Sequence, residues 1–194
     1  MTELRRGFKT WCENTARGYR RELALSPLSA LDPRALAAHL GILIWTPEDI
    51  PGLDPKCVEH LTVKARDGWS AATLRVGGDS LIIINSGHPR TRQNNSIAHE
   101  IGHVVLRHEP AKMYVTPDGL MMMSEYNLVH EEEATWFAGA VLVPRDALLD
   151  FVKRGIDNTE AAKLMAVSVK LLEMRRRRTG VDVQLSRQRG TWAP

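Results

Sequence analysis

Five residues, His99-Glu100-Ile101-Gly102-His103, constrain this 194-residue chain more than any other segment. On an α-helix, residues four apart lie on one face about one turn from each other, so the two imidazoles can reach a single Zn²⁺. The carboxylate between them can serve as general base toward a water molecule at that metal. We therefore expect His99 and His103 as metal ligands and Glu100 as the catalytic base.

The residues around this motif predict a helix of about three turns. Residues 94–96 (Asn-Asn-Ser) offer N-capping side chains, apolar residues then recur at helical spacing, and Pro110 stops the run. Gly102 inside this helix costs about 1 kcal/mol relative to alanine. We expect its benefit to be close approach of another backbone element to the metal face.

A catalytic zinc needs a third protein ligand and an open position for water. The metzincin pattern would require glycine at position 106 and histidine at position 109, but the chain has Leu106 and Glu109. That class of peptidase is therefore not expected. Glu109 itself would need a sharp turn of the chain without a glycine, and it stays a minor alternative.

A second predicted helix, with Asn127 as its N-cap, offers better candidates for the third ligand. Glu131 shares a helical face with Ala134 and Ala138, small residues that allow close packing against another helix. Glu131 is therefore favoured, and Thr135, one turn later, could hydrogen-bond a ligand histidine. The alternatives on the same helix are Glu132, Glu133 and His130.

Short apolar segments ahead of the motif predict a small antiparallel sheet. They are Ile42–Trp45, Trp69–Val76 and Leu81–Asn85, and the last two flank the hairpin signal Gly77-Gly78-Asp79-Ser80. Amphipathic helices precede them, the second starting at the Asp32-Pro33 cap. The predicted fold class is α+β, with the sheet packed on the metal helix and the glutamate-bearing helix. A substrate could add as an extended strand along the edge of Leu81–Asn85, which leads into the metal helix.

The C-terminal part predicts a helical subdomain that resembles a helix-turn-helix over residues 146–185, with a short turn at 166–168. It would follow a peptidase domain of residues 1–145 and precede a loose tail of residues 186–194. Arg175–Arg178 could meet DNA phosphates. However, they cluster at the C-terminal end of their helix, where they also suit the helix dipole, so packing on the peptidase and gripping a protein substrate is favoured.

The amino-acid composition indicates the cellular compartment that we expect for the protein. Hydrophobic residues make up 43% of the chain and charged residues 25%, as in soluble globular proteins. No apolar run is long enough to span a bilayer, and the N-terminus lacks the apolar core of a signal peptide. Cys12 and Cys57 are too few for a disulfide framework, and a net charge of +3 alone says little about nucleic acid. We expect a cytoplasmic protein.

Three segments carry a family likeness: residues 85–103, residues 131–144, and the opening Arg6-Gly-Phe-Lys-Thr-Trp. Together they resemble the ImmA/IrrE family of bacterial zinc metallopeptidases, over roughly residues 1–180. The resemblance implies a minimal gluzincin fold whose third ligand is the glutamate of an E-x-x-A pattern, here Glu131 followed by Ala134. It also implies cleavage of a DNA-binding repressor in a stress-response or mobile-element switch, and some relatives act in toxin-antitoxin pairs.

Two functions follow as hypotheses. The first is a zinc-dependent endopeptidase acting on a specific cytoplasmic protein, and it is favoured because a purely structural zinc needs no base such as Glu100 beside it. The second is a non-proteolytic regulatory or toxin-antitoxin partner with a structural or vestigial metal site. A donor for the tetrahedral oxyanion stays open among His88, Arg92, His108, Tyr114, Tyr126 and His130.

Overall fold

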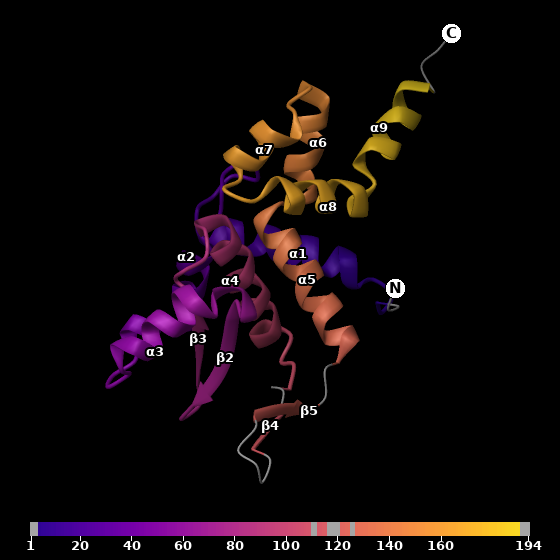
Figure 1. Cartoon of the computed structure of the whole chain (residues 1–194). Helices are drawn as coiled ribbons and strands as arrows, with labels where there is room; N and C mark the ends of the chain where they lie inside the picture. Colours follow the sequence, from indigo (N-terminus) through magenta and orange to yellow (C-terminus); the bar gives the residue numbers. More distant parts are fainter. Residues whose placement is uncertain (1–3, 110–111, 116–120, 125–126, 191–194) are drawn as a thin grey trace.

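The computed structural model of the chain describes residues 4–109, 112–115, 121–124 and 127–190. Most of this part is helical (Figure 1). Helices α1 (Phe8–Glu22) and α2 (Pro33–His39) precede the sheet, and the short α3 (Pro55–Glu59) lies between its first and second strands in the sequence. The two central helices are α4 (Arg90–Val105) and α5 (Leu128–Leu142). The C-terminal helices are α6 (Arg145–Arg154), α7 (Asn158–Leu164), α8 (Val169–Thr179) and α9 (Val181–Gly190).

The main sheet has three strands, β1 (Leu43–Trp45), β2 (Ala71–Val76) and β3 (Asp79–Ile84), in the order β1-β3-β2. The predicted hairpin is confirmed, because β2 and β3 pair antiparallel. The prediction of a purely antiparallel sheet is wrong, since β1 pairs parallel to β3, with Leu43 opposite Leu81. The long connection through α3 allows this, because a parallel pair needs a crossover whereas a hairpin needs only a turn.

The central position of β3 also overturns the predicted docking edge. Both sides of β3 are occupied by neighbouring strands, so no substrate strand can add there. Among the described residues, β2 forms one open edge of the sheet and β1 the other.

The stretch from Glu109 to Ser124, for which the sequence indicates no regular structure, contains a second, two-stranded antiparallel sheet. Its strands are β4 (Lys112–Val115) and β5 (Met121–Ser124). It lies near the ends of α4 and α5 that are farthest from α6 and α7 (Figure 1). The turn expected at residues 116–119 lies outside the described residues.

Helix α4 starts earlier than the sequence predicts. The capping prediction for residues 94–96 is wrong, because these residues lie inside a helix that begins at Arg90 after Pro89. Asn94 is buried, its side-chain amide donates to the carbonyl of Ala166 at 3.3 Å, and its side-chain oxygen accepts from Arg34 at 3.5 Å. Its polar atoms therefore serve long-range contacts instead of a local cap.

Two predicted caps are confirmed. The Asp32 carboxylate accepts from the backbone N–H of Arg34 at the start of α2, and Asn127 accepts from the N–H groups of Val129 and His130 at the start of α5. Each side chain satisfies N–H groups that a helix start leaves without a partner.

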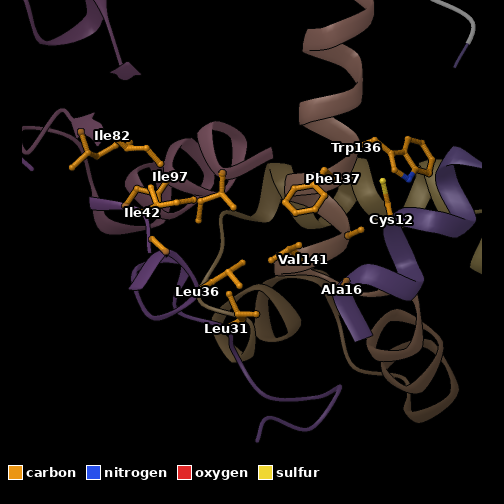
Figure 2. Packing of buried hydrophobic residues seen from close by; sticks show 14 of the residues in the cluster. Cys12, Ala16, Leu31, Leu36, Ile42, Ile82, Ile97, Trp136, Phe137 and Val141 are labelled. Carbon is orange, nitrogen blue, oxygen red and sulfur yellow. The ribbon is translucent and has the colours of Figure 1, made fainter. Parts of the chain in front are cut away.

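One hydrophobic core joins α1, α2, the main sheet, α4 and α5. Figure 2 shows Phe137 and Val141 of α5 between side chains from α1 and those around Leu36 and Ile97. A second cluster joins Ala98 of α4 and Leu142 of α5 to side chains from α6 to α9. The C-terminal helices therefore pack on the same two helices that carry the predicted metal ligands.

The helix-turn-helix pattern of the C-terminal part is present as α7 and α8, and Ser168 caps α8 by accepting from the N–H of Leu171. Helix α9 runs through Gly190, whereas the sequence predicts a tail from residue 186. Within the described ranges, no helix is both long and apolar enough to cross a membrane.

Candidate metal centre

Three side chains from α4 and α5 converge on one point. The Nε2 atoms of His99 and His103 lie 3.0 Å apart. The Glu131 carboxylate lies 3.1 Å from His99 Nε2 and 3.5 Å from His103 Nε2. All three side chains are partly buried, with 20–32% of each exposed. The group could therefore hold a metal ion and still be reached from solvent.

Close packing of the two helices produces this convergence. A Cβ atom on Gly102 would lie 3.2 Å from both the Cα of Ala134 and the Phe137 ring. Because Gly102 has no side chain, the α5 backbone can pass directly over the metal face of α4, as predicted. Ala134 lies three residues after Glu131, so the same contact brings Glu131 toward the histidines.

The donor set fits Zn²⁺. Two imidazole nitrogens and one carboxylate oxygen are a ligand set of known catalytic zinc sites, in which a fourth position stays open. The other candidate ligands point elsewhere: Glu132 accepts from Arg178 at 2.9 Å, and Glu133 lies 3.1 Å from His108 Nε2. Glu109 and His130 are not members of the converging group.

The titration of the group reflects its burial and its mutual contacts. Burial lowers the pKa of His103 to about 4, and the neighbouring His99 adds to this effect. The hydrogen bond with His99 lowers the pKa of the Glu131 carboxyl. Neutral imidazoles and an ionised carboxylate are the forms that bind a metal.

Glu100 lies beside the group but is not one of its three members. Burial raises the pKa of its carboxyl, and a hydrogen bond from the Thr73 hydroxyl at 2.5 Å opposes that rise. Thr73 lies on β2, the edge strand, so the sheet reaches the predicted base directly. The sequence shows Thr73 only as a polar position within a predicted strand, and it does not predict the contact with Glu100.

The structure narrows the candidates for the oxyanion donor. His88 donates from Nε2 to the carbonyl of Arg66, and Arg92 donates to Asp67 and Ser70. Both ring nitrogens of His108 face other side chains, His103 and Glu133. The ring of His130 stacks on that of His108, and no hydrogen bond is found for it among the described residues. The Tyr114 side chain and all of Tyr126 lie outside what the structure describes.

Thr135, the predicted hydrogen-bonding partner of a ligand histidine, makes no hydrogen bond to His99 or His103 within the described part of the chain. His103 Nδ1 instead faces His108 at 3.0 Å.

A cavity of about 630 Å³ lies between the β2–β3 turn and the C-terminal end of α4. Its lining includes Arg75 and Ser80 from the sheet and Val104, Arg107 and His108 from the end of α4. Its lining includes His108, which contacts His103, but none of the three converging side chains.

The family model of the IrrE N-terminal-like domain, Peptidase_M78, matches residues 59–177. The chain belongs to this family. Membership suggests a metallopeptidase and confirms the family resemblance of the metal motif and the glutamate helix. The matched segment contains the whole His99, His103 and Glu131 group and continues through α6 and α7 into α8. It does not include the opening segment around Phe8. The search of curated proteins finds no match for the chain.

Proposed function

We propose that this member of the Peptidase_M78 family is a cytoplasmic zinc-dependent endopeptidase with a minimal gluzincin fold. Its proposed substrate is a DNA-binding repressor of stress-response or mobile-element genes. The observation that carries the proposal is the convergence of His99, His103 and Glu131, from two helices, onto one point beside Glu100. The substrate class rests on the family resemblance alone.

A zinc ion held by this group supplies Lewis acidity and activates a water molecule for attack on a peptide carbonyl. Glu100 then has the role of general base. Its carboxylate accepts the proton of the attacking water and later delivers it to the leaving amine. Burial of Glu100 suits this role, because a carboxyl with a raised pKa holds the proton more readily once it has accepted it.

The edge strand β2 is the proposed docking site for the substrate backbone. An extended peptide can add to an open strand edge through main-chain hydrogen bonds. Thr73 of this strand contacts Glu100, so a peptide on β2 would pass beside the base. The cavity next to Arg75 and Arg107 then has room for a side chain of the substrate.

Replacement of Glu100 by glutamine tests the proposal. Glu100→Gln keeps the shape of the side chain and removes its basicity, so zinc content should be unchanged and cleavage should fall by at least about 100-fold. Cells that express either the wild type or the variant are compared by N-terminal proteomics. A new N-terminus found only with the wild type identifies the substrate.

The opposite result would favour the alternative function. If the wild type and Glu100→Gln give the same N-termini and the same cellular phenotype, the metal site is structural or vestigial. The chain then acts through binding, as a regulatory or toxin-antitoxin partner.

A further inference from the structure

Behind His103, on the side away from His99 and Glu131, lies a second set of polar side chains. His103 Nδ1 is 3.0 Å from His108 Nδ1, and His108 Nε2 is 3.1 Å from the Glu133 carboxylate. His108 is 7% exposed and Glu133 is 9% exposed. Arg5 lies 3.6 Å from Glu133, on the solvent side. These contacts form a continuous hydrogen-bonded series from the buried Glu133 carboxylate through His108 to the predicted metal ligand His103.

The backbone at the end of α4 places His108 in this hydrogen-bonded series. The backbone N–H of His108 donates to the carbonyl of His103, and the N–H of Arg107 donates to the carbonyl of Val104. This pair of bonds is a Schellman motif, and Arg107 takes the left-handed conformation that the motif requires, with φ of 55°. The turn folds His108 back against the last turn of the helix, next to His103.

Helix α5 contributes the other contacts of His108. Glu133 follows the predicted ligand Glu131 by two residues on α5. The ring of His130 stacks on the ring of His108, with centroids 4.1 Å apart and planes 4° from parallel. His108 is therefore held by a hydrogen bond at each ring nitrogen and by a ring against its face.

The Glu133 carboxylate, at the end of this hydrogen-bonded series, fixes the positions of the ring hydrogens. A carboxylate can only accept, so the contact with Glu133 places the hydrogen of neutral His108 on Nε2. His108 Nδ1 then carries a lone pair and accepts from His103 Nδ1–H. A neutral imidazole has one N–H, so His103 Nε2 is left with a lone pair. That lone pair faces His99 Nε2 and the Glu131 carboxylate.

We propose that Glu133 and His108 are positioning residues that hold His103 as the Nδ1–H tautomer, with its Nε2 lone pair aimed at the metal. The inference rests on the metal site of the proposed function and deepens it. Partners of this kind fix the orientation and tautomer of a ligand histidine, and their loss typically costs 10- to 100-fold in metal affinity.

Zinc affinity, measured by competition with a chromophoric chelator, tests the proposal in variants of the full chain. His108→Leu and Glu133→Ala should each weaken zinc binding by about 10- to 100-fold. His108→Asn should bind within a few-fold of the wild type, because its Oδ1 can still accept from His103 Nδ1–H. Glu132→Ala is the matched control, since Glu132 is bonded to Arg178 and should leave zinc affinity unchanged. Equal affinity in all four variants and the wild type would overturn the proposal.

A second readout needs neither a variant nor bound metal. The ¹⁵N chemical shifts of the His103 ring in the metal-free wild type should be those of the Nδ1–H tautomer. The Nε2–H tautomer would overturn the proposal. Because this readout uses the metal-free protein, it also separates the two claims: a wild type that binds no zinc contradicts the proposed function, whereas the ring shifts test the positioning alone.

Discussion

Single residues decide whether the metal group can act on a substrate. The convergence of His99 and His103 follows from their spacing along one helix, which the sequence shows, whereas the role of Glu100 as the base stays a prediction. Thr73 and the arrangement of His108 were not predictable, since each depends on a contact between elements. The small residues Ala134 and Ala138 favour Glu131 among three consecutive glutamates, and the observed approach of the Ala134 backbone to Gly102 agrees with that reasoning.

Thr73→Val should make activity more sensitive to acid. The Thr73 hydroxyl stabilises the ionised Glu100 and so lowers a pKa that burial raises. Without it the pKa rises further, and the base is protonated at a pH where the wild type is still ionised. A hydrogen bond to a charged group contributes about 1.5 kcal/mol, so the acid limb of the kcat/KM profile should move up by about one pH unit, which is up to about a tenfold loss on that limb.

The comparison for this prediction is Thr73→Ser, which keeps the hydroxyl and should keep the wild-type pH profile. Cleavage rates of the substrate found by proteomics are measured from pH 5 to pH 8 for all three proteins. A Thr73→Val profile that overlays the wild type would show that Thr73 does not tune Glu100.

At the level of elements, the contact between α4 and α5 builds the metal group. The sequence predicted elements that depend on local signals, such as the β2–β3 hairpin and the Asn127 cap. It did not predict the parallel pairing of β1 or the early start of α4. These depend on contacts between distant residues, for example the bond from Asn94 to Ala166.

Gly102→Ala should separate the two helices. The added Cβ would meet the Ala134 backbone at 3.2 Å, and backbone cannot rotate away as a side chain can. Glu131 should then move away from the histidines, with zinc affinity falling about tenfold. Overpacking costs about 1–3 kcal/mol, and the gain in helix propensity of about 1 kcal/mol offsets part of it. The metal-free protein should therefore lose no more than about 2 kcal/mol of stability.

The matched control is Gly18→Ala on α1, where an added Cβ meets nothing within 4 Å. This change should stabilise the protein by about 1 kcal/mol and leave zinc affinity unchanged. Chelator competition and urea unfolding measure the two quantities. If Gly102→Ala behaves like Gly18→Ala, close approach at Gly102 is not what positions Glu131.

Across the whole molecule, the C-terminal helices are tied to the helices around the metal group by charge as well as by apolar packing. Arg175 of α8 is 1% exposed and donates to Glu13 of α1 at 2.6 Å. Arg178 bonds to Glu132, and Arg176 bonds to Asp182. The bonds of Arg175 and Arg178 support the predicted packing role of these arginines, whereas the bond of Arg176 stays within the C-terminal helices. The direct binding of DNA and the predicted domain boundaries stay predictions.

Arg175→Met should destabilise the whole chain by about 3 kcal/mol, because it leaves the partly buried Glu13 carboxylate without its cation. The double variant Glu13→Gln/Arg175→Met should recover part of this loss. Arg178→Met should cost no more than about 1 kcal/mol, since its pair with Glu132 is more exposed. Urea unfolding measures all three. A loss below 1 kcal/mol in Arg175→Met would show that this ion pair does not hold α8 against α1.

The most direct test of the metal site is the zinc content per chain, measured by elemental analysis for the wild type, Glu131→Ala and Glu132→Ala. The three-ligand site predicts one equivalent in the wild type, a large loss in Glu131→Ala, and no loss in Glu132→Ala. A wild type without zinc even after reloading, or a Glu131→Ala variant that keeps the full equivalent, would contradict it.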